Sequence, residues 1–162
     1  MRARVQVDWA ALGDVLSHLS DDELTRPGPD GWAVKDHIAH IAEWERACTA
    51  VLQHRAQSEG FAIDEPTYAA LDSNLDALND ILYQRHRGES ISEVKDFAAR
   101  AHADILAEIS LLRDADLRRP VGDFGMNTEP RRPLIEKIAG DSYAHYAEHT
   151  TWIGNLIDAL RG

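Results

Sequence analysis

The sequence predicts an all-α protein, a four-helix bundle with a long helical crossover between the second and third helices. Four long segments repeat apolar residues every three to four positions, which gives a helix one buried face. Clusters of proline, glycine and helix-capping residues separate these segments. No segment shows the alternating, β-branched pattern that is typical of a strand.

The first two helices are predicted over residues 8–19 and 33–57. The first carries its apolar face on Trp9, Leu12, Val15, Leu16 and Leu19. Residues 20–31 contain two prolines and two glycines, which predict a turn or loop. The second helix has an apolar stripe made of Val34, Ile38, Ile41, Cys48, Val51 and Leu52, and Gly60 ends the segment.

Residues 61–90 form the predicted crossover, which has helical content of its own. Asp64 is the expected N-cap of a helix that carries Pro66 in its first turn. Later in the crossover, leucine and isoleucine recur at helical spacing up to Gly88, where a helix is expected to end.

The third long helix is expected to begin at Ser90, because Ser90 and Glu93 have the spacing of a capping box, and to run to about residue 112. A polar loop over residues 114–132 follows. The last helix is predicted over residues 133–160, with a proline in its first turn.

Composition limits the class of protein. With 162 residues, the chain is predicted to form a single domain over residues 1–162. A net charge of −11 argues against nucleic acid or an anionic membrane as partner, since both favour basic surfaces. The single cysteine, Cys48, allows no internal disulfide, and the sequence shows no signal peptide or membrane span, so a cytoplasmic location is expected.

Three histidines carry most of the functional information. His40, and the pair His145 and His149, lie in two stretches that share the pattern Ala-His-x-Ala-Glu. The pair is spaced i, i+4, so both imidazoles project from one helix face. With His40 from another helix, they predict a divalent-metal site with three protein ligands and one open position, which is typical of catalytic centres.

The sequence leaves two possible roles open for each of several other residues near these histidines. His37 lies three positions before His40 and is either a competing ligand or a flanking polar residue. Glu43 and Glu148 each follow a candidate ligand by three positions and are the candidate catalytic residues, as general bases or as acceptors that orient an imidazole. The competing interpretation is that both glutamates lie on a solvated helix face and have no role in the site. Trp44 and Trp152 either wall a substrate pocket or pack in the core.

Three stretches resemble the DinB-like superfamily and, within it, the ClbS/DfsB-like subgroup. Residues 31–45 are similar to its helix-two signature, residues 145–153 to its closing motif, and stretches within residues 75–94 to the subgroup. The resemblance covers nearly the whole chain. It implies a four-helix bundle, a homodimer, and a zinc or nickel site whose ligands match His40, His145 and His149.

The resemblance leaves the reaction open, because a shared fold does not fix chemistry. Some members of the family use bacillithiol or mycothiol as transferases or isomerases, and others are hydrolytic, including one that opens a reactive cyclopropane. The subgroup features favour metal-dependent hydrolysis or detoxification of a small reactive metabolite. The alternatives are transfer to a low-molecular-weight thiol, and a non-catalytic, stress-related metal-binding or dimerisation bundle.

Overall fold

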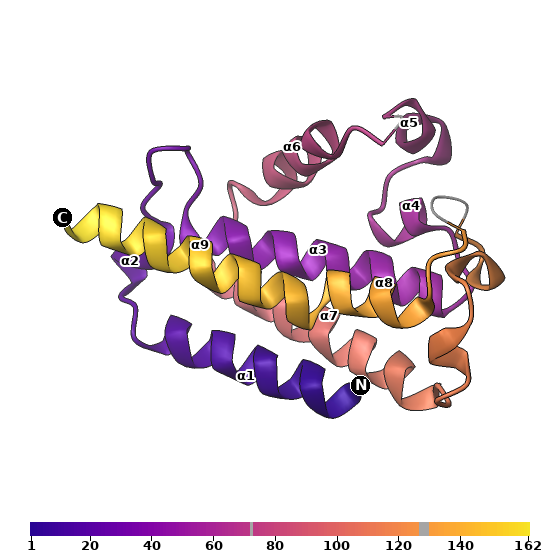
Figure 1. Ribbon diagram of the computed structural model, residues 1–162. Coiled ribbons are helices and arrows are strands. Elements are labelled where there is room, and N and C mark those ends of the chain that lie inside the picture. The colour runs from indigo at the N-terminus through magenta and orange to yellow at the C-terminus, as the bar shows by residue number, and fades with distance from the viewer. Residues whose placement is uncertain (72, 127–129) are drawn as a thin grey trace.

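The computed structural model describes residues 1–71, 73–126 and 130–162, and all regular structure in these ranges is helical apart from one isolated bridge between Pro120 and Pro133. Four long rods form the bundle (Figure 1). They are α1 (Arg2–Ser17), α3 (Val34–Leu52), α7 (Ile91–Leu111), and α8 (Leu134–Asp141) followed by α9 (Tyr143–Arg161). The predicted all-α four-helix bundle is therefore confirmed.

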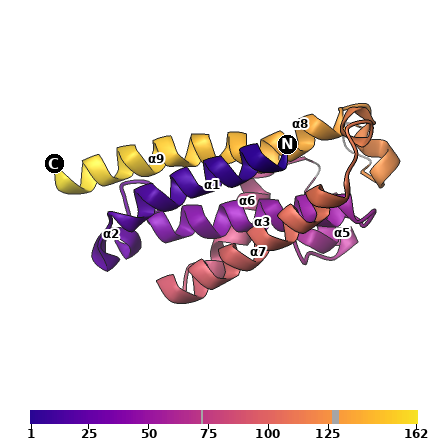
Figure 2. The same ribbon diagram turned by 90° about the horizontal axis from the view of Figure 1, so that it is seen from below.

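The long helices pack around one hydrophobic core. Helix α3 contacts α7, α8 and α9, while α1 contacts α9 and α7, as the view in Figure 2 also shows. Fully buried apolar side chains from all four rods fill the centre, among them Leu12, Ile41, Ile105, Ile138 and Ile153. None of the helices in the described ranges combines the length and the apolar character needed to cross a membrane.

Helix α3 is enclosed on nearly every side. The crossover helices α4 (Gln57–Gly60), α5 (Glu65–Ala70) and α6 (Leu75–His86) lie on the side of the bundle shown at the top of Figure 1, and both α4 and α6 contact α3. As a result, seven polar or charged residues of α3 are buried: Lys35, Asp36, His37, His40, Glu43, Glu45 and Thr49. Buried polar groups need partners, so these side chains determine the chemistry inside the bundle.

Two predicted helix starts in the middle of the chain are confirmed. The carboxylate of Asp64 accepts a hydrogen bond from the backbone N–H of Thr67 at the start of α5. Ser90 and Glu93 form the predicted capping box at the start of α7. Residue 72 of the crossover and residues 127–129 of the predicted loop lie outside the described residues.

Several predicted boundaries near the chain's start are wrong. Helix α1 begins at Arg2 rather than at residue 8, because the buried side chain of Val5 extends its apolar face by a turn. The predicted loop over residues 20–31 contains the short helix α2 (Asp21–Thr25), which a capping box at Ser20 starts. Helix α3 ends at Leu52, before His54 adopts a left-handed φ of 57°.

The predicted last helix is in fact two helices. Ser142 separates α8 from α9 with a non-helical backbone (φ −135°, ψ −110°), and its hydroxyl donates to the carbonyl of Ile138. A serine that bonds to the carbonyl four residues earlier competes with the helical backbone, and Gly140 nearby weakens the helix further. The break lies one turn before His145.

Candidate metal centre and its pocket

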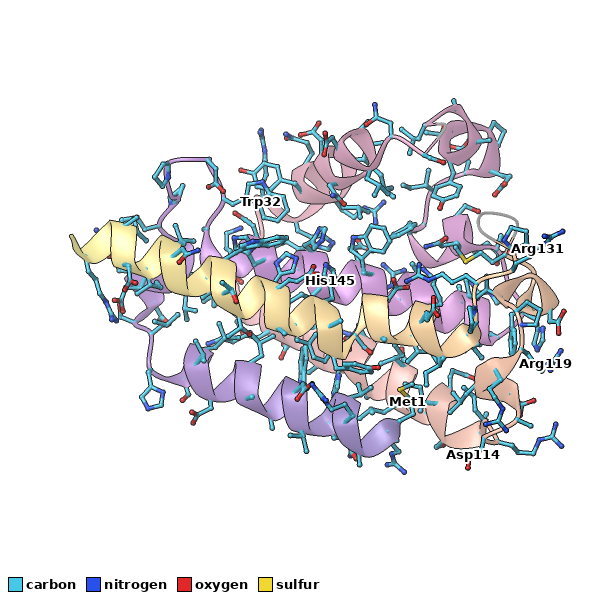
Figure 3. The ribbon with its side chains drawn as sticks, in the orientation of Figure 1. Met1, Trp32, Asp114, Arg119, Arg131 and His145 are labelled. Carbon is cyan, nitrogen blue, oxygen red and sulfur yellow. The ribbon has the colours of Figure 1, made fainter. Side chains whose placement is uncertain are left out.

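The structure brings the three predicted histidines together. His40 comes from α3 and the other two come from α9. The Nε2 atom of His145 lies 3.1 Å from Nε2 of His40 and 3.0 Å from Nε2 of His149. One ligand atom from each of the three lies within 4.8 Å of the other two. Figure 3 shows His145 on α9 beside α3.

The spacing of these nitrogens suits a metal ion. A tetrahedral zinc with bonds of about 2.0–2.1 Å separates its ligand nitrogens by about 3.3–3.4 Å. The two observed distances are within a few tenths of an ångström of that separation. A cation between the three imidazoles would accept one nitrogen lone pair from each of them, provided that each ring carries its proton on Nδ1. The residues present therefore fit a divalent metal.

Burial keeps the three imidazoles neutral. Burial, with the nearby His145 as a smaller cause, lowers the pKa of His40 to about 3. Burial followed by the charge of Lys137 lowers the pKa of His145 to about 4, and burial also lowers the pKa of His149. A histidine must be unprotonated to bind a metal, so the site holds its ligands in the required form at neutral pH.

His37 does not compete with His40 for the cluster. Its Nδ1 atom lies 2.9 Å from Nδ1 of His149, on the far side of that ring from the other two ligands. For His149 to present Nε2 to a metal, its proton must be on Nδ1, where it donates to His37. His37 must then carry its own proton on Nε2. His37 thus holds His149 in the tautomer and orientation that a ligand needs.

The cluster lies in the wall of a cavity of about 800 Å³, within the range of small-molecule sites. The loop before α3 contributes Asp30 and Trp32, and α6 contributes Leu75 and Asn79. The remaining walls come from α3, α8 and α9, and include Trp44, Asp141, Glu148 and Trp152. Trp44 and Trp152 therefore line the pocket, as one of the two interpretations of the sequence expected.

The two candidate bases lie in different surroundings. Glu148 is exposed and lines the cavity, and it lies between the two histidines of α9 in the sequence. Glu43 is fully buried and is not part of the cavity wall. Its carboxylate is 2.6 Å from Nη1 of Arg85, 2.7 Å from Nε2 of His86 and 3.2 Å from Nη1 of Arg46. These three partners occupy the carboxylate, which favours a structural role for Glu43.

A buried ion pair supports the pocket near the helix break. Nζ of Lys137 lies 2.5 Å from a carboxylate oxygen of Asp141, and both side chains are almost inaccessible. The same ammonium lies 5.6 Å from the centre of the Trp44 ring. Burial raises the pKa of Asp141, while Lys137 opposes that change. Because Asp141 is already paired, its charge is largely neutralised on the cavity side.

Some pocket residues have no signal in the sequence. Asn79 belongs to α6, whose apolar pattern identifies only the face that packs on the bundle. Trp32 stands in a loop, where its neighbours give no periodicity to interpret, and only the resemblance of residues 31–45 to the family includes it. His102 is also buried but does not line the cavity. Its ring is stacked on that of Trp9, and its Nδ1 is 2.9 Å from the buried carboxylate of Glu45.

The sequence of the chain matches a family model. The model for the DinB superfamily matches residues 4–151. The chain belongs to the DinB superfamily. This match includes all three clustered histidines and confirms the superfamily that the sequence resembles, whereas the ClbS/DfsB-like subgroup stays a prediction.

Further comparisons of this DinB-superfamily chain concern its fold. No curated protein matches its sequence. Its structure is similar to the crystal structure of a Streptococcus pneumoniae protein, a Northeast Structural Genomics Consortium target, with a TM-score of 0.77 and 13% identity. The match covers 98% of this chain and 88% of that one. At this identity the similarity shows the shared fold alone.

Proposed function

We propose that this DinB-superfamily chain is a metal-dependent hydrolase that acts on a small, reactive electrophile. The observation that carries the proposal is the convergence of three neutral imidazoles, through their Nε2 atoms, at the wall of a cavity large enough for a small molecule. His40, His145 and His149 would hold the ion. Imidazole ligands suit zinc and nickel, among other ions.

The ion, when bound, supplies a Lewis acid that polarises the substrate and lowers the pKa of a water molecule. The protein's own residues supply the rest. Glu148 lines the same cavity as the ligand histidines and would accept a proton from water. Trp32, Trp44 and Trp152 line the cavity beside the ligand histidines and would contact the bound substrate. The subgroup resemblance favours this hydrolytic role over transfer to a low-molecular-weight thiol.

Turnover of simple electrophiles tests the proposal. We expect zinc- or nickel-loaded protein to accelerate hydrolysis of 4-nitrophenyl acetate or styrene oxide without any thiol. Glu148→Gln should lower kcat by about 100-fold or more, the usual contribution of a general base. Product release is followed with and without glutathione. Turnover that requires the thiol would contradict hydrolysis and support the transferase. Failure of both substrates in both conditions would favour a non-catalytic bundle.

Metal affinity tests the role assigned to His37. His37→Leu removes the acceptor for the Nδ1 proton of His149, so we expect zinc affinity to fall by about 10- to 100-fold. His37→Asn keeps an acceptor oxygen near the same position and should retain most of the affinity. Both variants are measured by competition with a zinc chelator. Equal affinities for the two variants would show that the hydrogen bond is irrelevant.

A further inference from the structure

The cavity wall has an uneven chemical composition. Three tryptophans line it, Trp32, Trp44 and Trp152, and so do three carboxylates, Asp30, Asp141 and Glu148. Among the described residues of the wall there is no lysine or arginine. Such a wall offers aromatic rings and negative charge, and it offers an anion no fixed cationic partner apart from the proposed metal.

The three indoles surround the histidine cluster. The Trp32 ring lies 5.6 Å from the His40 ring, centre to centre, and the Trp152 ring lies 4.6 Å from the His149 ring. The Trp44 ring is 6.1 Å from the rings of both His40 and His145. Figure 3 shows Trp32 and His145 on the same side of the bundle. A molecule bound beside the histidines would therefore contact tryptophan.

Two of the three carboxylates have no ion-pair partner among the described lysines and arginines. Lys137 pairs with Asp141, but neither Asp30 nor Glu148 forms an ion pair with any described lysine or arginine. Both are exposed. One oxygen of Asp30 accepts the backbone N–H of Trp32 at 3.1 Å, which fixes this carboxylate beside an indole. The net charge of −11 adds a long-range field that attracts cations to the protein as a whole.

The cavity also exposes apolar surface. Trp152 is 49% exposed and Leu75 is 56% exposed, and both belong to the wall. About half of each side chain is exposed, so neither is fully packed in the hydrophobic core. Large apolar side chains gathered at an open cavity are typical of a surface that a ligand covers.

We propose that the cavity accepts a molecule with an apolar body and a positively charged amine, protonated or quaternary. The ammonium would lie near Asp30 against tryptophan, which is the best cation–π partner among side chains. The apolar body would cover Leu75 and the indoles. This inference rests on the proposed function, since the reacting end of the molecule would face the histidines. The ion's own positive charge there places the ammonium away from it.

A matched set of probes tests the inference. The probes share a phenylbutyl body and end in trimethylammonium, hydroxyl or sulfonate. The trimethylammonium group cannot coordinate a metal, and sulfonate does so only weakly. Their affinities for the metal-free and the zinc-loaded protein are measured by quenching of tryptophan fluorescence and by calorimetry. We expect the ammonium probe to bind about 10-fold or more tightly than the alcohol, and the sulfonate to bind most weakly.

Two variants locate the effect. Trp152→Leu keeps an apolar side chain but removes the aromatic ring, and Asp30→Asn removes a charge while keeping the acceptor oxygen. Each should reduce the ratio of ammonium to alcohol affinity by roughly three- to tenfold. An alcohol that binds as tightly as the ammonium, a tighter sulfonate, or ratios unchanged in both variants would overturn the inference.

The outcome is separable from that of the proposed function. Zinc content and hydrolysis are measured on the same preparations. A preference for the ammonium probe in protein that binds no metal would support the charge preference and contradict the metal-dependent reaction. If the protein binds metal and hydrolyses the substrates but prefers the sulfonate probe both with and without zinc, the result would support the metal-dependent reaction and contradict the charge preference.

Discussion

Acidification from about pH 7.5 to about pH 4.5 should destabilise the metal-free protein by on the order of 5 kcal/mol through His40 and His145 alone. Burial lowers the pKa of His40 to about 3 and that of His145 to about 4, while a histidine in the unfolded chain has a pKa near 6.5. Between these values the unfolded state binds protons that the folded state does not. Stability is therefore fully present above about pH 6.5 and is lost as the pH falls.

Urea unfolding of metal-free protein at several pH values measures this effect. Since native proteins are stable by only about 5–15 kcal/mol, the protein should be close to unfolding at the acidic end. Burial raises the pKa of Glu45 and Asp141, and these carboxyls act in the opposite direction. The control is His145→Gln, which should make the dependence shallower by about 1.4 kcal/mol per pH unit. Identical slopes for the two proteins would contradict the burial of a neutral His145.

Replacing Glu43 with leucine should destabilise the protein by about 3 kcal/mol, because it leaves the partners of a buried carboxylate unpaired. Burial alone would lower the pKa of His86, but its hydrogen bonds to Glu43 and Glu89 outweigh burial and raise it. Without Glu43, the buried imidazole loses one of these two acceptors. Arg46 and Arg85 keep partial access to solvent, which moderates the loss.

Denaturant unfolding of Glu43→Leu beside Glu148→Gln separates a structural carboxylate from a catalytic one. Glu148 is exposed and has no described ion pair, so its substitution should change stability by less than about 0.5 kcal/mol while lowering turnover. A Glu43→Leu protein of unchanged stability with lost turnover would show that Glu43 acts in the reaction.

The part of the site that repeats with helical periodicity could be predicted from the sequence. His145 and His149 are one turn apart, and the shared motif pointed to His40 as their partner. These positions depend only on helix geometry and on the packing of α3 against α9. The cap at Asp64 and the capping box at Ser90 were predictable for the same reason, because both are local in sequence.

Features that depend on contacts across the bundle could not be predicted. Glu43 and Glu148 occupy the same position in the repeated motif, but α6 covers Glu43 and places Arg85 and His86 against it. The role of His37 depends on the ring orientation of His149, which no pattern encodes. The break at Ser142 interrupts a continuous apolar pattern. The homodimer, the cytoplasmic location and the thiol partner stay predictions.

Metal content is the most direct test of the central claim. Elemental analysis compares protein purified without a metal-affinity tag with the His145→Ala/His149→Ala double variant. We expect about one equivalent of zinc or nickel in the parent protein and none in the variant, because the two substitutions leave His40 as the only ligand. No metal in the parent, even after reconstitution with zinc and with nickel, would contradict the account.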